Sequence, residues 1–186
     1  VAFARSPMTL AETAHDINVL SKGRLILGLG SQIRPHITKR FSMPWSKPAS
    51  RMREYILALH AIWDCWYKGE KLDFRGEFYT HTLMTPMFTP TDTEYGAPRV
   101  ALAAVGPRMT EVAGEVAAQV AAGSRYISVV MLESFLRDGN QNAEGVEPAQ
   151  LVHGQSITDA CMSWERSEPV FAELAAAVRA RRERKT

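Results

Sequence analysis

The stretch GRLILGLGSQIRPH, residues 23–36, begins as an apolar strand and ends in residues with short side chains. The run from Arg24 to Leu29 is almost continuously apolar, which is typical of a strand in a parallel sheet covered by helices on both faces. Gly28 and Gly30 leave the backbone bare where this strand ends. The residues alone leave two explanations open: close packing within the protein, or the close approach of a ligand.

An α/β pattern extends on the N-terminal side of this stretch. Val1 to Ala4 has the composition of the end of a strand, and Ser6-Pro7 signals the start of a helix. Apolar residues then follow at helical spacing up to Gly23, namely Leu10, Ala14, Ile17 and Leu20. Strand, helix and strand within about 30 residues predict a right-handed βαβ unit.

The pattern continues on the C-terminal side with a long helix, a hairpin and another strand. A helix is predicted over 47–68, because one face is apolar and Gly69 follows it. That face comprises Met52, Tyr55, Ile56, Leu59, Ile62, Trp63 and Trp66. The alternating stretch 71–81 predicts a β-hairpin that turns at Arg75-Gly76. Arg99 to Val105 is predicted as a buried strand that leads into a helix starting at Pro107.

The last third of the chain gives weaker signals. Arg125 to Leu132 has the composition of a strand, and residues 137–156 show no periodicity. Ser167-Glu168-Pro169 predicts the start of a final helix. The basic run from Arg179 to Lys185 suits the C-terminal end of that helix, where the helix dipole favours cations.

Composition narrows the class of protein. The 186 residues carry a net charge of +2, with 46% apolar and 23% charged residues, so nothing points to nucleic acid as a partner. Cys65 and Cys161 have no metal or redox spacing, which favours a reducing cytoplasm. No apolar run reaches the ~18 residues that a membrane span needs. Because the sequence starts at Val1, inside a predicted strand, we expect a piece of a longer protein.

The glycines do not fit the common nucleotide-binding motifs. GLGSQI is similar to a dinucleotide fingerprint, but Ile33 stands where the third glycine is needed, and Pro35 and Pro44 interrupt the helix that should follow. No glycine-rich loop ends in Gly-Lys-Ser/Thr, which excludes a P-loop.

The stretch VGPRMTE, residues 105–111, is a clearer candidate site. A predicted strand ends there, Gly106 turns the chain, and Pro107 opens a helix whose first N–H groups are unpaired and partly positive. Arg108 adds a full positive charge, so this place suits a phosphate. The alternative is an exposed arginine in an ordinary first turn.

The histidines divide into two groups. His15 and His60 fall within predicted helices and are interpreted as structural. His36 and His81 lie in predicted loops, and they are the candidate catalytic residues, for proton transfer or a polar contact. No group of His, Cys and carboxylate residues has metal-ligand spacing, so no metal is predicted.

Four stretches together resemble the luciferase-like monooxygenase family, in the branch that uses the deazaflavin coenzyme F420. They are residues 2–17, 23–63, 74–88 and 98–117, and their order and spacing agree as well. The most diagnostic part is RFSMPWSKPASRMREY, residues 40–55. The resemblance covers about Val1 to Ala117.

The resemblance implies an α/β fold, a TIM-barrel-like (β/α)8 that is incomplete because the family's first two strands are absent. It implies that Val1–Ala4 ends the third barrel strand, that Arg24–Leu29 and Arg99–Val105 are the fourth and fifth, and that an insertion covers about 70–98. We therefore expect a partial barrel over 1–123 and an unmatched segment over 124–186 that ends in a helix.

The same resemblance implies an oxidoreductase that transfers hydride between a small organic substrate and the ring of coenzyme F420. FMN is the alternative cofactor, in a flavin monooxygenase. The implied cofactor-binding residues are Ala4, Gly28, Gly30, Ser31 and Gln32 around the ring, and Gly106, Pro107 and Arg108 at the phosphate-bearing tail. A hypothesis of another class is a degenerate, non-catalytic barrel fragment that acts as a folded or oligomeric scaffold. Unpaired sheet edges and the apolar face around Trp63 predict a homo-oligomer.

Overall fold

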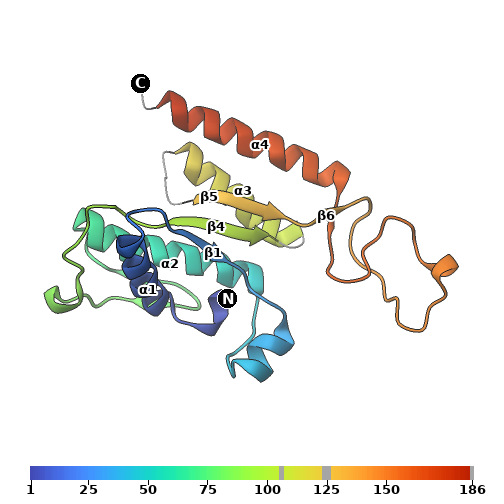
Figure 1. The fold of residues 1–186 in the computed structure, drawn as a ribbon, viewed down its shortest axis with the longest axis horizontal. Helices are drawn as coiled ribbons and strands as arrows, with labels where there is room; N and C mark the ends of the chain where they lie inside the picture. Colours follow the sequence, from blue (N-terminus) through green and yellow to red (C-terminus); the bar gives the residue numbers. More distant parts are fainter. Residues whose placement is uncertain (105–106, 123–126, 185–186) are drawn as a thin grey trace. The chain divides into compact units, whose positions relative to one another are not determined.

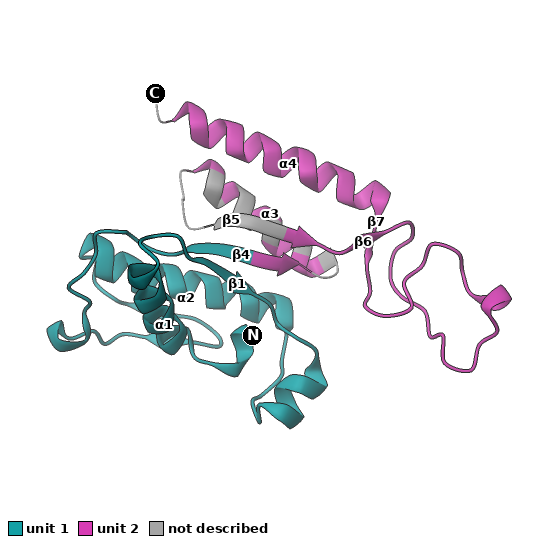
Figure 2. Cartoon of the chain, in the orientation of Figure 1, with its two compact units in different colours: residues 1–101 teal, residues 102–186 magenta. Residues whose placement is uncertain are grey.

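The computed structural model describes residues 1–104, 107–122 and 127–184. The chain divides into two compact units, Val1–Ala101 and Leu102–Thr186 (Figure 2). The relative position of the chain's parts is not determined, so each unit is described by itself.

Helix α1 (Pro7–Leu20) begins where the sequence predicts (Figure 1). The Ser6 hydroxyl accepts a hydrogen bond from the Thr9 N–H at 3.2 Å, which satisfies one of the free donors of the first turn. The predicted inner face is partly wrong, since Ile17 and Leu20 are exposed. The buried residues of α1 are Pro7, Ala11, Ala14, His15 and Asn18. Their small or polar side chains allow α1 to pack close to the following long helix.

Helix α2 (Pro48–Lys68) confirms the predicted long helix, and Gly69 ends it with a left-handed φ of 71°. Every residue of the predicted apolar face is buried, and Trp63 has no exposed surface. Met52, Ile56 and Trp66, expected to require cover from a second chain, are thus covered within this one. His15 of α1 shares a hydrogen bond of 2.6 Å with the Tyr67 hydroxyl and lies edge-on to Trp66, which supports its structural interpretation.

A three-stranded sheet lies in the order β1-β4-β5, formed by β1 (Ile26–Leu29), β4 (Arg99–Ala104) and β5 (Ile127–Leu132). The predicted neighbours β1 and β4 are confirmed, and the architecture is α/β. Among the described residues no closed barrel is formed. The prediction that β1 is buried on both faces is wrong: only Leu29 is buried, and Ile26 is 44% exposed. The physical reason is that only one face of β1 is covered: Leu27 is half-buried and Leu29 is buried, whereas Ile26 and Gly28 on the other face are exposed.

The chain's first residues form a turn of 3-10 helix, η1 (Ala2–Ala4), and the expected end of a strand is wrong. The Arg5 N–H turns back to the Ala2 carbonyl at 3.2 Å, which closes the turn. The Ala2 N–H still donates to the Gly30 carbonyl at 2.9 Å, so η1 lies beside the chain just after β1.

The predicted hairpin is confirmed as β2 (Phe74–Arg75) and β3 (Thr80–His81), which pair antiparallel. A short turn η3 (Pro86–Phe88) follows in the predicted insertion. Between β1 and α2 the chain forms one π-helical turn, η2 (His36–Arg40).

The second unit contains α3 (Pro107–Ala121), β6 (Ser134–Phe135), η4 (Pro148–Gln150), β7 (Met162–Ser163) and α4 (Trp164–Glu183). Strands β6 and β7 pair parallel. The predicted start of the last helix is wrong, because α4 begins before Pro169 and includes it. The Ser167 hydroxyl donates to the Ser163 carbonyl at 2.9 Å within the first turn, upstream of the proline.

None of the helices among the described residues combines the length and apolar character that a membrane span requires.

The burial of His60 on α2 predicts acid sensitivity. Desolvation lowers the pKa of this imidazole from 6.5 to about 4, against a smaller opposing effect of Asp64. The unfolded chain therefore takes up the proton first, so this contribution to stability is complete above pH 6.5 and is lost as the pH falls toward 4. In that window we expect the free energy of unfolding to fall by up to about 1.4 kcal/mol per pH unit from this group. Urea denaturation of the wild type and His60→Gln across this range measures it, and equal pH dependence in both would contradict it.

Candidate functional site

The carboxyl end of β1 leaves its backbone accessible. A Cβ built on Gly28 meets no heavy atom within 4 Å, so packing within the protein does not require a glycine there. Of the two explanations for this glycine, close packing within the protein is therefore not supported, and the binding of a ligand stays a prediction. Ala4 and Gly30 are half-buried nearby, joined through the hydrogen bond between η1 and Gly30.

The loop after β1 brings three predicted site residues together. Gln32 Oε1 lies 3.0 Å from His36 Nδ1, and both side chains are exposed. Gln32 has a φ of 60°, a left-handed conformation uncommon for residues other than glycine. Ser31, half-buried, connects Gln32 to Gly30. His36 is thus oriented by Gln32, and it can exchange a proton with a ligand or solvent through its other ring nitrogen.

Arg51 on α2 lies behind this region and was not among the predicted site residues. It is 7% exposed, and its guanidinium lies 4.7 Å from the centre of the Phe3 ring of η1. Its Nε donates to the Tyr79 hydroxyl at 2.8 Å, and its Nη1 donates to the Pro44 carbonyl at 2.6 Å. One buried cation with neutral partners therefore ties η1, the loop before α2 and the hairpin together. Arg51 lies within the most diagnostic stretch, residues 40–55, but that stretch indicates the family and not these contacts.

Aromatic rings complete this cluster. Phe3 lies edge-on to Trp45, with ring centres 5.9 Å apart, and Tyr79 lies edge-on to Tyr55 at 5.4 Å. The Tyr55 hydroxyl donates toward the carbonyls of Arg5 and Ser6. Burial, with a smaller effect of Tyr79, raises the pKa of Tyr55, so this phenol stays neutral and acts as a fixed donor.

Glu54, also on α2, holds the root of the hairpin. Its carboxylate accepts hydrogen bonds from three consecutive backbone N–H groups, those of Glu77, Phe78 and Tyr79, at 2.8, 2.7 and 2.6 Å. A Cβ on Gly76 would overlap this carboxylate and displace it from its present position, so glycine at 76 favours the close approach. The insertion is therefore fixed to α2 at one end.

His81, the other candidate catalytic residue, lies on β3 and is half-buried. Desolvation lowers the pKa of its imidazole, which favours the neutral form. Its Nε2 is buried and has no hydrogen-bond partner among the described residues. His81 and His36 belong to different elements, and no described contact joins them.

An open cavity of about 600 Å³ lies between the end of α2 and the insertion. Its lining includes Cys65, Leu72, Thr82, Met84, Thr85 and Thr89. None of the predicted site residues lines it, so this cavity and the carboxyl end of β1 are separate features of the first unit.

The predicted phosphate-binding residues belong to the second unit. Arg108 is exposed on the first turn of α3, which begins at Pro107 as predicted. Gly106 lies outside the described residues. Because the relative position of the units is not determined, Arg108 is not placed against the residues around β1.

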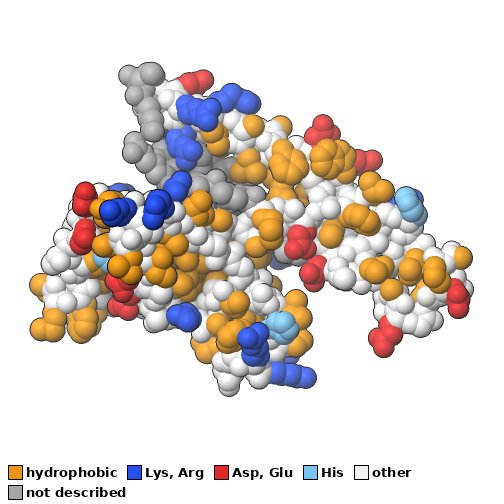
Figure 3. All heavy atoms as spheres, in the orientation of Figure 1, with side chains coloured by type: hydrophobic (Ala, Val, Ile, Leu, Met, Phe, Trp, Pro, Cys, Tyr) orange, Lys and Arg blue, Asp and Glu red, His pale blue; other side chains and the backbone are white. Residues whose placement is uncertain are grey.

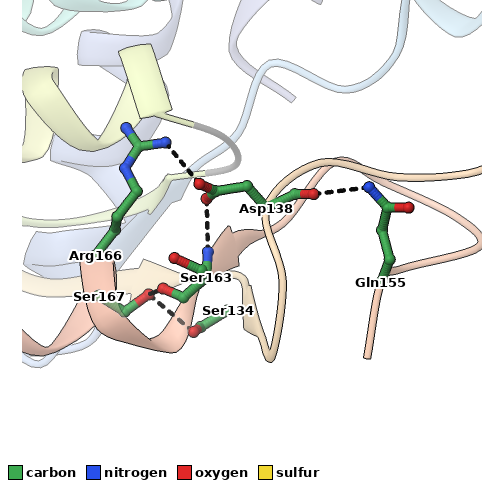
Figure 4. A network of polar contacts seen from close by, with 6 residues as sticks. All are labelled: Ser134, Asp138, Gln155, Ser163, Arg166 and Ser167. Carbon is green, nitrogen blue, oxygen red and sulfur yellow. Dashed lines mark hydrogen bonds and ion pairs between the residues drawn. The ribbon is translucent and has the colours of Figure 1, made fainter. Parts of the chain in front are cut away.

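A polar network in the second unit holds the start of α4 (Figure 4). The Asp138 carboxylate accepts from the Ser163 N–H at 2.7 Å and from Arg166 Nη1 at 3.3 Å. The Ser163 hydrogen bond is the main cause that lowers the pKa of Asp138. The Ser167 hydroxyl donates to Ser134 Oγ at 2.8 Å. This network ties Ser163, which precedes α4, and the first turn of the helix to residues 134–138, and we interpret it as structural. Among the described residues, no group of three or more His, Cys, Asp or Glu side chains has a geometry suited to a metal ion.

The family model of the luciferase-like monooxygenases matches residues 1–137, about three quarters of the chain. The chain belongs to the luciferase-like monooxygenase family. The match includes the carboxyl end of β1, the loop to α2, and the Arg51 cluster. It confirms the family that residues 40–55 indicate, and that family implies a TIM-barrel fold; the described residues show an α/β architecture.

Relatives of this luciferase-like chain include uncharacterized proteins of Mycobacterium tuberculosis (strain H37Rv) and Mycobacterium bovis. Each is 57% identical over 141 residues, a match that covers 74% of this chain and 42% of the relative. The chain thus spans less than half the length of these curated relatives.

A second class of protein is also similar to the luciferase-like chain. The Trp-sensitive phospho-2-dehydro-3-deoxyheptonate aldolase of Enterobacter agglomerans is 54% identical over 71 residues, 38% of this chain and 20% of the aldolase. A solved structure of such an aldolase from Francisella tularensis matches 45% of this chain and 25% of its own, at 30% identity and a TM-score of 0.41. That score is too low to support a shared fold.

Proposed function

We propose that this chain is part of an oxidoreductase that binds a flavin or the deazaflavin F420 at the carboxyl end of β1. The observation that carries the proposal is the family match over 1–137, which includes this end of the strand. The open space over Gly28 supports it, because a flat ring system needs backbone without a side chain at its face. When bound, the cofactor would accept or donate the hydride of an organic substrate.

The residues of this chain would position the ring rather than perform the chemistry. Gly28, Gly30 and Ser31 would border it, and Ala4 would lie on the side of η1. Gln32 would keep His36 oriented, so that the free ring nitrogen of His36 can hold or transfer a proton. The Arg51 cluster would fix η1 and the Trp45 loop behind the ring. F420 is proposed ahead of FMN because residues 40–55 resemble the F420 branch.

Cofactor affinity is expected to depend on Arg108 if the phosphate-bearing tail reaches the start of α3. A charge-assisted hydrogen bond to phosphate contributes roughly 1.5–3 kcal/mol, so Arg108→Ala should weaken binding by about ten- to a hundredfold. Binding should not vanish, because the N–H groups of the first turn remain. Titration of F420 and FMN, each followed by fluorescence, measures both affinities.

Arg34→Ala is the comparison for this experiment. Arg34 is exposed like Arg108, but it precedes only the short turn η2, whereas Arg108 lies at the start of a full helix. If Arg108→Ala binds the cofactor normally and Arg34→Ala loses cofactor affinity, the phosphate-bearing tail binds at the loop after β1 and not at α3. If the wild type binds neither F420 nor FMN, the non-catalytic scaffold hypothesis takes the place of this proposal. The aldolase likeness covers a fifth of those enzymes and supports no second activity here.

A further inference from the structure

Positive charge is concentrated in one part of the first unit. Between Asp16 and Glu54 the sequence contains no acidic residue, although the whole chain carries 20 Asp and Glu against 22 Lys and Arg. The same stretch contains eight basic residues: Lys22, Arg24, Arg34, Lys39, Arg40, Lys47, Arg51 and Arg53. The nearly neutral chain therefore has a strongly cationic segment, and that segment includes the loop after β1.

The cations of the loop after β1 differ in whether a described carboxylate pairs with them. Lys47 pairs with Glu77 at 2.6 Å, and Arg51 uses neutral acceptors. Arg34, Lys39 and Arg40 are exposed, and no carboxylate of the described residues forms an ion pair with them. Arg40 contacts the ring of its neighbour Phe41 at 5.3 Å. Figure 3 shows basic side chains and a histidine gathered over the segment that Figure 1 colours light blue.

The backbone that carries Arg34, Lys39 and Arg40 is held in place by burial and hydrogen bonds. Ile37, in the middle of η2, has no exposed surface and anchors the turn. The N–H groups of Phe41 and Met43 donate back to the carbonyls of His36 and Ile37 at 3.1 and 3.0 Å. Gln32 and Ser42 have positive φ values of 60° and 55°. Strained residues and π-helical turns persist where surrounding structure enforces them, and they are frequent at functional sites.

We propose that the loop from Ser31 to Lys47, called here the basic loop, binds the anionic group of the substrate, a carboxylate or a phosphate ester. The proposal rests on the proposed function and names its substrate class. Guanidinium groups bind such anions through paired hydrogen bonds, so Arg34 and Arg40 are the expected contacts. The loop directly follows the carboxyl end of β1, the end at which barrel enzymes of this architecture bind ligands. An anion bound by the basic loop would therefore lie next to the end of β1 that carries the open backbone at Gly28.

Pyrophosphate titration of the 186-residue chain by calorimetry tests the basic loop without any cofactor. We expect Arg34→Gln/Arg40→Gln to weaken pyrophosphate binding at least about tenfold, and added salt to weaken binding to the wild type. Arg24→Gln is the matched control, because Arg24 is also exposed but precedes β1 at its opposite end. The substituted side chains are exposed, so thermal unfolding should be unchanged. No pyrophosphate binding to the wild type, or an equal loss in Arg24→Gln, would overturn the proposal.

FMN and riboflavin, which differ by one phosphate, separate substrate from cofactor. If the basic loop serves the substrate, the preference for FMN over riboflavin is the same in the wild type and in the double variant. If the double variant loses the preference for FMN, the basic loop binds the phosphate of the cofactor. That result would overturn the substrate assignment. Failure of the proposed function is distinct: the wild type would then bind pyrophosphate through the basic loop but neither FMN nor F420.

Discussion

Replacing Trp63 by alanine is expected to lower the free energy of unfolding of the first unit by about 3–5 kcal/mol. The indole has no exposed surface and lies on the buried face of α2, between Leu59 and Trp66 in the helical pattern. Its removal loses the transfer free energy of the ring and leaves a cavity that a rigid helix cannot close. Urea denaturation followed by far-ultraviolet circular dichroism measures the change, with coincident probes as the check for a single transition.

Trp164 offers a control with the same substitution. It is 55% exposed on the first turn of α4, so Trp164→Ala should cost less than about 1 kcal/mol. A loss in Trp63→Ala no greater than that in Trp164→Ala would show that the α2 face is not the core of the first unit. Trp63→Phe should recover most of the loss, because an aromatic ring still fills much of the space.

Glu54→Ala is expected to release the root of the insertion and to cost about 2–4 kcal/mol. Each hydrogen bond from a backbone N–H to a carboxylate contributes roughly 1.5–3 kcal/mol, and the half-buried position of Glu54 reduces the sum. Amide hydrogen exchange at Glu77, Phe78 and Tyr79 is the sharpest measurement, because it separates local opening from global unfolding. We expect all three amides to lose protection together.

Two variants make this expectation specific. Glu54→Gln keeps the size of the side chain but removes its charge and replaces one acceptor oxygen by a donor, so it should give an intermediate loss of protection. Glu12→Ala, at an exposed position of α1, should leave these amides unchanged. Unaltered exchange at Phe78 and Tyr79 in Glu54→Ala would refute the role of this carboxylate.

The elements that could be predicted from the sequence are those with strong local signals. Ser6 and Pro7 start α1, the apolar spacing from Met52 to Trp66 defines α2, and Gly69 ends it. The hairpin and the neighbouring strands β1 and β4 were predictable for the same reason, since alternation and apolar runs are local properties.

The errors arose where distant contacts decide the structure. The apolar run before Gly28 suggests burial on both faces, but burial depends on the strands and helices that cover it, and only the face of β1 with Leu27 and Leu29 is covered. Pro169 suggests a helix start, but α4 already begins at Trp164, and the N–H of the preceding Ser163 is held by Asp138, 25 residues earlier in the chain. The division of the chain into segments 1–123 and 124–186 stays a prediction.

The candidate site was predictable in part. Gln32 and His36 lie four residues apart, and the structure joins them by a hydrogen bond. The role of Arg51 was not predictable, because an arginine beside Met52 on a helix gives no sign of the Phe3, Pro44 and Tyr79 contacts that bury it. These contacts join residues up to 48 positions apart in the sequence, a separation that no local pattern encodes.

The attachment of the insertion by Glu54 and Gly76 has a consequence for how this family can diverge. The root of the insertion is constrained on both sides, by a carboxylate that accepts from three amides and by a glycine whose replacement would displace that carboxylate. The outer residues 82–91 carry no such constraint, and many of them line the cavity of about 600 Å³. Mutations there can alter the shape and polarity of the cavity while the helices beneath stay in place. The insertion thus offers a place where substitutions can change what the cavity admits while its attachment to α2 is kept.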